Sequence, residues 1–154
     1  MVSKSQFTAL CVTGLLAGNE LGTLIGFHPA ARTLPLRSQI EAEQAFTARL
    51  GKFMPFYIAS SLTAAGVAAI HRRGRPGFAL SLLSVAATAG MLGITVVAEL
   101  PLNKQTIDFP LDGDAEDFGT VRRRWERFHK ARVVLDLVAF GSLGLAAIEQ
   151  PPAE

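Results

Sequence analysis

The sequence contains little cysteine and little charge, and each shortage excludes a class of function. Cys11 is the single cysteine among 154 residues, so the chain has no internal disulfide and no dithiol pair. Asp, Glu, Lys and Arg make up only 18% of the residues, and the net charge of +2 is small and mixed in sign. There is also no aromatic and basic surface of the kind that stacks nucleotides. We therefore expect no dithiol redox chemistry and no nucleic acid partner.

Hydrophobic residues are abundant, at 49% of the chain, and they gather in four stretches separated by charged loops. Each stretch is close to the roughly 20 residues that a helix needs to cross about 30 Å of hydrocarbon. The stretches are Gln6–Phe27, Phe53–Ile70, Gly77–Leu100 and Ala131–Ile148. We predict an all-α integral membrane protein of one domain, residues 1–154, in which four antiparallel helices form a multi-pass bundle surrounded by lipid in the cell membrane.

The connecting segments refine this topology. In the first loop, Ser38–Leu50 has an apolar side and predicts a short amphipathic helix at the membrane interface. The acidic segment Pro101–Gly119 reads as a solvated loop, and helix resumes from Val121. A tight turn joins the second and third spans, so both termini should lie on one face. Lys and Arg are more numerous in the first and third loops, which weakly favours placing those loops in the cytoplasm, but orientation stays open.

Four glycines spaced four residues apart mark the first span: Gly14, Gly18, Gly22 and Gly26. Successive members are about 40° apart around a helix, so they form one slowly winding groove. Inside a bilayer, helices associate through close packing of such small residues. We therefore predict that another helix packs against this glycine groove, either within the chain or across a homo-oligomer.

Asn19 and Glu20 lie in the middle of the same span. A carboxylate inside the membrane costs about 2.5–3.5 kcal/mol or more, so such a residue is a functional candidate by default. The alternative is that Glu20 only makes a polar contact between helices. We assign both residues to a ligand-binding site.

A polar stripe marks the start of the fourth span. Trp125, His129, Arg132 and Asp136 are four, three and four residues apart, which places all of them along one side of a helix. Such a stripe entering the bilayer should face the bundle interior, and Arg132 and Asp136 have the spacing to neutralise each other. The alternative is an interfacial anchor, with Trp125 in the aromatic belt, but an anchor does not need Asp136.

Further polar residues reach the same half of the membrane from other spans. Glu99 and Asn103 lie at the end of the third span and His28 at the end of the first, with Glu20 a turn or two deeper. These positions predict a polar pocket under the first and third loops that binds a hydrophobic small molecule. Tyr57, near the start of the second span, is included among the ligand-binding candidates.

Several of these motifs resemble a known family. Pro101-Leu102-Asn103, followed by W-x-x-x-H-x-x-R from Trp125 to Arg132, is similar to the anthrone oxygenase-like family of small four-helix membrane proteins. Gly18-Asn19-Glu20-Leu21, His28-Pro29 and Met54-Pro55 look like segments of its actinobacterial members. The resemblance implies an oxygenase that converts the activated methylene of a polycyclic anthrone to a quinone without a known flavin or haem. By matching position it assigns the site to Asn103, Trp125, His129 and Arg132.

Three functions follow from the residues and the resemblance. The first is an oxygenase for a phenol-like compound, with dioxygen as co-substrate and no other cofactor. There His129 would remove a proton while Arg132 and Asn103 hold the resulting oxyanion. The second is a metal or haem protein using His28 and His129, although no metal ligand set is assigned. The third is a noncatalytic membrane subunit or small-molecule carrier whose glycine groove is the important surface.

Overall fold

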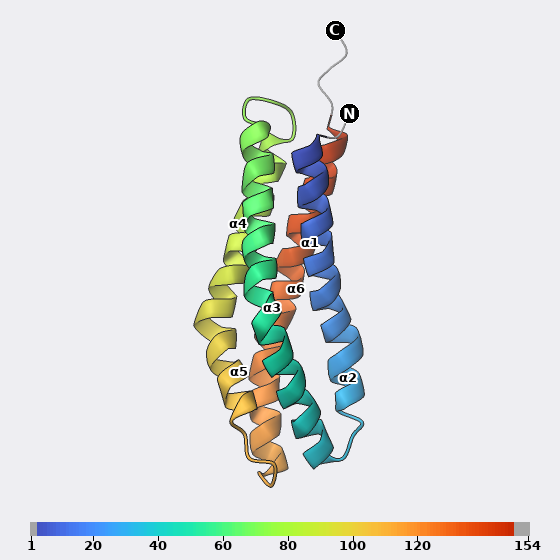
Figure 1. Cartoon of the computed structure of the whole chain (residues 1–154), viewed down its shortest axis with the longest axis vertical. Coiled ribbons are helices and arrows are strands. Elements are labelled where there is room, and N and C mark those ends of the chain that lie inside the picture. The colour runs from blue at the N-terminus through green and yellow to red at the C-terminus, as the bar shows by residue number, and fades with distance from the viewer. Residues whose placement is uncertain (1–2, 150–154) are drawn as a thin grey trace.

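In the computed structural model, which describes residues 3–149, the chain forms four helical rods that run alternately down and up one long axis (Figure 1). The first rod contains α1 (Lys4–Gly22), the π-helical turn η1 (Thr23–Phe27) and α2 (His28–Ala31), and the second rod is α3 (Leu36–His71). The third contains α4 (Phe78–Ile94), the π-helical turn η2 (Thr95–Glu99) and α5 (Leu100–Ile107), and the fourth is α6 (Ala115–Ile148). Residues 3–149 contain no strand.

All four rods are long and apolar enough to cross a membrane, which confirms the predicted four-helix fold. Large apolar side chains face outward on them, including Phe56 at 73% and Val97 at 79% exposed. Such an outer surface fits a multi-pass membrane protein. The start of α1 and the end of α6 lie at the same end of the bundle, as predicted (Figure 1).

Local chemistry explains where the helices begin and turn. The side chains of Ser3 and Asp114 cap α1 and α6 by accepting hydrogen bonds from backbone N–H groups in the first turn. Between α3 and α4 the backbone reverses through Gly74 and Gly77, whose φ angles of 74° and 79° disfavour residues with a Cβ. The short reversal holds α3 and α4 antiparallel.

The two π-helical turns allow prolines inside the first and third rods. Proline has no N–H and clashes with the carbonyl four residues earlier, so it normally ends a helix. Here the residue before Pro29 or Pro101 donates its N–H to the carbonyl of the threonine five residues earlier, Thr23 or Thr95. The wider turn makes room for the ring. Each rod therefore continues past its proline.

The prediction of a separate interfacial helix at Ser38–Leu50 is wrong. This segment is the first part of α3, which runs unbroken for 36 residues and includes Pro55. Ile40, Glu43 and Thr47 are buried along it, so its inner side packs in the bundle instead of lying on the membrane surface. The interpretation of this segment failed because the same amphipathic pattern suits both settings.

The predicted acidic loop is also shorter than expected. The third rod continues to Ile107 and α6 already begins at Ala115, so the connecting loop covers only residues 108–114. The 34 residues of α6 extend about 50 Å at 1.5 Å per residue, against about 30 Å of hydrocarbon. At least one end of α6 must therefore extend beyond the hydrocarbon of a membrane that it spans.

The rods pack in a square, because α1 and α4 each contact both α3 and α6. A core of Leu16, Ile58 and Met91 fills the centre of the bundle. Nearer the chain ends, the core narrows to small residues around Leu143 that include Ala9, Ala65 and Ala68. Small side chains let the helices approach closely. The buried histidines, arginines and glutamates lie on the other side of the central core, towards the loops.

The glycine groove is mostly open. A Cβ added at Gly14 would lie 2.9 Å from the ring of Phe140, so α6 does approach the first rod there. At Gly18, Gly22 and Gly26 an added Cβ would meet no atom of the described chain within 4 Å. These three glycines are therefore not a contact between helices of one chain. A homo-oligomer through them stays a prediction.

Two substitutions separate packing within the chain from packing between chains. We expect Gly14→Leu to lower the free energy of unfolding by about 1–3 kcal/mol because it overpacks against Phe140. Gly18→Leu should change it by less than about 0.5 kcal/mol in a monomer. Thermal unfolding in detergent, with light scattering to measure mass, checks both. A smaller mass for Gly18→Leu alone would support the oligomer, and destabilisation of a monomeric Gly18→Leu would contradict this account.

Candidate functional site

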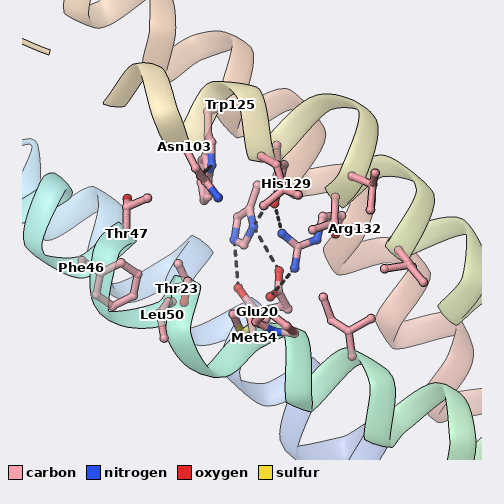
Figure 2. Close-up of a pocket in the computed structure, with 18 of the residues that line it drawn as sticks. Glu20, Thr23, Phe46, Thr47, Leu50, Met54, Asn103, Trp125, His129 and Arg132 are labelled. Atoms are coloured by element: carbon pink, nitrogen blue, oxygen red, sulfur yellow. Dashed lines mark hydrogen bonds and ion pairs between the residues drawn. The ribbon is translucent and has the colours of Figure 1, made fainter. Parts of the chain in front are cut away.

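A buried group of charged side chains joins three rods in the loop half of the bundle. Glu20 comes from α1, Glu99 from the end of η2, and His129 and Arg132 from successive turns of α6. Arg132 Nη2 donates to Glu20 Oε1 at 2.7 Å, and Arg132 Nη1 forms an ion pair with Glu99 Oε2. Figure 2 shows Glu20, His129 and Arg132 pointing towards one another. One guanidinium therefore holds two carboxylates from different rods.

The contacts of His129 indicate where its protons lie. Its Nε2 is 3.2 Å from the backbone oxygen of Glu20, which can only accept, so Nε2 carries a hydrogen. Its Nδ1 is 3.2 Å from Glu20 Oε2 and 3.8 Å from Glu99 Oε1. Nδ1 thus faces oxygens of two carboxylates, so a proton that reaches this side of the ring can be shared between the imidazole and a carboxylate.

A second buried group lies closer to the loops and contains His28, Glu43 and Arg122. Glu43 Oε1 is 2.9 Å from His28 Nδ1, and Glu43 Oε2 is 3.1 Å from Arg122 Nη2. Arg122 Nη2 is also 2.9 Å from His28 Nδ1. The three side chains tie α2, α3 and α6 together, and Glu43 and Arg122 neutralise each other in a buried setting where an unpaired charge would be costly.

Trp125 contacts both charged groups. Its ring stacks on His129 with centroids 4.4 Å apart, and His28 approaches it edge-on at 4.6 Å. The guanidinium carbon of Arg122 lies 4.4 Å from the centre of the indole, a cation–π contact. The indole N–H donates to Asn103 Oδ1 at 2.7 Å. Because its oxygen is taken, Asn103 has its amide N–H groups left to offer to a ligand.

A pocket of about 240 Å³ lies between α3 and the η2–α5 segment, and the first charged group forms its inner end (Figure 2). Its walls are largely apolar, and they include Phe46, Leu50, Met54, Ile58, Leu92 and Val96. Its polar lining includes Glu20, Glu99, Asn103, Trp125, His129 and Arg132. The volume is slightly below the roughly 300–1,000 Å³ of drug-sized ligand sites. A compact, mostly apolar ligand with one polar edge fits it.

The structure brings six of the ten predicted site residues into this pocket, and it places the other four elsewhere. His28 is not part of the lining and belongs to the second charged group. Asn19 is half-buried and its amide faces Met54 Sδ at 3.6 Å. Tyr57 is 41% exposed on the outer surface of α3. Asp136 is fully buried one turn from Arg132 and is not part of the lining.

The predicted pairing of Arg132 with Asp136 does not form. Arg132 turns to Glu20 and Glu99 instead, and neither carboxylate oxygen of Asp136 has a hydrogen-bond partner within residues 3–149. The reason is geometric, since two carboxylates from other rods reach the guanidinium in the core.

Sequence reasoning missed Glu43 and Arg122, although both left a signal. Arg122 lies three residues before Trp125 and continues the alternating spacing of the polar stripe on α6 towards the loops. Glu43 lies three residues after Ile40 and four before Thr47, in the middle of the buried side of α3. A charged residue inside a helical apolar stripe predicts a buried partner. The separate treatment of residues 38–50 hid that signal.

A metal site has little support from the ligand geometry. No group of three or more His, Cys, Asp or Glu side chains within residues 3–149 is arranged to hold a metal ion. His28 and His129 approach each other with ring centroids 5.9 Å apart, but Trp125 contacts both rings. Both ring nitrogens of His129 already face oxygen atoms of Glu20.

The pairing of Arg132 can be tested by rescue. Arg132→Ala should lower the free energy of unfolding by about 3–5 kcal/mol, because two buried carboxylates lose their shared cation. Adding Glu99→Gln should recover part of this loss, whereas adding Asp136→Asn should recover none. Thermal unfolding in detergent measures each variant, and Arg124→Ala, an exposed arginine on the same helix, is the matched control. Equal rescue by Asp136→Asn would contradict the observed pairing.

Comparison with known proteins finds a match to one family model. A family model described as Anthrone oxygenase matches residues 43–142, well over half of the chain. No curated protein and no solved structure matches the chain. The matched range contains the four residues that the sequence motifs singled out, Asn103, Trp125, His129 and Arg132, while Glu20 and His28 precede it. The chain belongs to the anthrone oxygenase family.

Proposed function

We propose that this protein is an integral membrane oxygenase that uses dioxygen to oxidise a compact, hydrophobic phenolic or polycyclic compound resembling an anthrone. One observation carries the proposal: an apolar pocket ends on a buried group of two carboxylates, one imidazole and one guanidinium. Such a group takes up a proton beside an apolar ligand from which water is largely excluded. Family membership supports oxygenase chemistry in general and leaves the substrate open.

We propose roles for these residues that differ from those predicted from the sequence, and their contacts support the proposal. Both ring nitrogens of His129 face groups of the protein, so a carboxylate, Glu99 or Glu20, removes the proton from the ligand. His129 Nδ1 then holds that proton between the two carboxylates. The terminal nitrogens of Arg132 hold the glutamates, which makes it a positioning residue. The amide of Asn103, free on its nitrogen side, donates to the oxyanion.

The reaction needs no second oxidant or reductant. Loss of a proton from an activated methylene leaves a carbanion whose charge spreads to the neighbouring carbonyl oxygen. The carbanion gives one electron to dioxygen, and the two radicals combine to form a carbon–oxygen bond. The resulting peroxide takes up a proton and loses water, so one methylene and one dioxygen become one carbonyl and one water. In this proposal dioxygen is the co-substrate and no further cofactor takes part.

Turnover of anthrone tests the proposal. Protein in phospholipid vesicles should form anthraquinone and consume oxygen faster than protein-free vesicles do. Glu99→Gln and His129→Ala should each lower kcat by about 100-fold or more, because proton removal is lost. Arg124→Ala, an exposed residue of α6, is the matched control and should leave the rate unchanged. Failure to oxidise both anthrone and 1,8-dihydroxyanthrone, or full activity in both site variants, would contradict the proposal.

The two other functions make different predictions. A haem or metal protein would show a Soret band or one equivalent of metal after purification in detergent, and either result would contradict a cofactor-free oxygenase. A carrier would bind anthrone tightly and release it unchanged.

We further propose that the protein resides in the cell membrane, which fractionation of cell envelopes tests.

A further inference from the structure

The exposed part of the pocket lining is confined to two neighbouring rods. Among the described lining residues, five are exposed: Gly51, Pro55, Ala59, Val96 and Leu100. The first three line one side of α3, and the other two lie opposite them on η2 and α5. The remaining lining residues are buried or half-buried. The mouth of the pocket is therefore the gap between α3 and the η2–α5 segment.

This mouth faces the apolar surface of the bundle. Phe53 and Phe56 on α3 and Val97 on η2 are large, exposed and apolar, and they are close in sequence to the exposed lining residues. Towards the loops, the pocket is closed by side chains that are half-buried or buried, including Thr47, Asn103 and Trp125. A ligand in the hydrocarbon therefore meets an opening, and one in water meets a closed end.

We infer that the ligand enters sideways from the hydrocarbon of the membrane, through the mouth between α3 and the η2–α5 segment. The chemical class of the ligand rests on the proposed function, whereas the route of entry rests on the shape of the pocket alone. The ligand class is a membrane-dissolved amphiphile with a flat apolar body and a hydroxyl or carbonyl at one edge. The body crosses the apolar mouth, and the polar edge reaches Glu99, Asn103 and His129.

The backbone at the mouth suits a hydroxyl-bearing ligand. A Cβ added at Gly51 would meet no atom of the described chain within 4 Å, so the absence of a side chain there keeps the gap wide. Pro55 has no N–H with which to pair the carbonyl of Gly51, its usual partner four residues earlier. A carbonyl without a partner is costly next to lipid. A ligand hydroxyl that donates to it on the way in lowers that cost.

The single tryptophan of the chain makes the inference measurable without any substrate. Trp125 lines the pocket and is only 7% exposed. The protein is reconstituted in phosphatidylcholine whose acyl chains carry bromine, which quenches indole fluorescence at short range. We expect clear quenching in the parent, because acyl chains reach Trp125 through the mouth, and at least twofold less quenching in Gly51→Leu and in Val96→Phe.

Gly93→Leu is the matched control, because Gly93 is an exposed glycine of α4 that does not line the pocket and an added Cβ there meets no described atom within 4 Å. It should be quenched like the parent. Equal quenching in the parent and both mouth variants would overturn the inference. Stronger quenching by water-soluble acrylamide, unaffected by Gly51→Leu, would overturn it too. Anthrone turnover is measured separately. If the quenching results are as expected but anthrone is not oxidised, only the proposed function is contradicted.

Discussion

The pairing of one buried guanidinium with two carboxylates is the interaction on which the arrangement of the rods depends. Arg132 on α6 holds Glu20 of the first rod and Glu99 of the third, two rods that sit diagonally in the square. Each of these charges costs several kcal/mol to bury, and only correct geometry repays that cost. A slip of either rod along α6 would leave a charge without its partner. The pairing therefore fixes the register that shapes the pocket floor.

The depth of the site suits both its charges and its apolar pocket. The charged groups lie in the loop half of the bundle, where α6 is rich in arginine. In a membrane, ionised side chains cost much less near the surface than at the centre of the bilayer. On the side of the charged groups that faces the chain ends, the core of Leu16, Ile58 and Met91 fills the interior of the bundle. The site thus lies between an apolar outer surface and the arginine-rich loop end of the bundle.

The sequence was a good guide to the membrane spans and a poor guide to what lies beyond them. Hydropathy located four helices because lipid demands apolar residues over a known length. Outside the lipid, polar residues suit a helix or a loop equally, so both ends of the acidic segment Pro101–Gly119 were misread as loop. Spacing identified Trp125, His129 and Arg132 because they share one helix. It suggested Asp136 as the partner of Arg132, because contacts between rods leave no trace in the spacing of one helix.

The wide turns η1 and η2 have a consequence for how the molecule can vary. One residue of an α-helix corresponds to about 100° of rotation, so a turn that holds one extra residue changes the angular phase of everything after it. Beyond η2, the face of α5 that carries Asn103 is set independently of the lipid-facing side of α4. If the same residues formed a regular α-helical turn in place of η2, Glu99 and Asn103 would rotate together, away from Arg132 and Trp125. The geometry of this one turn therefore sets the direction of two site residues, while the helix before it is unaffected.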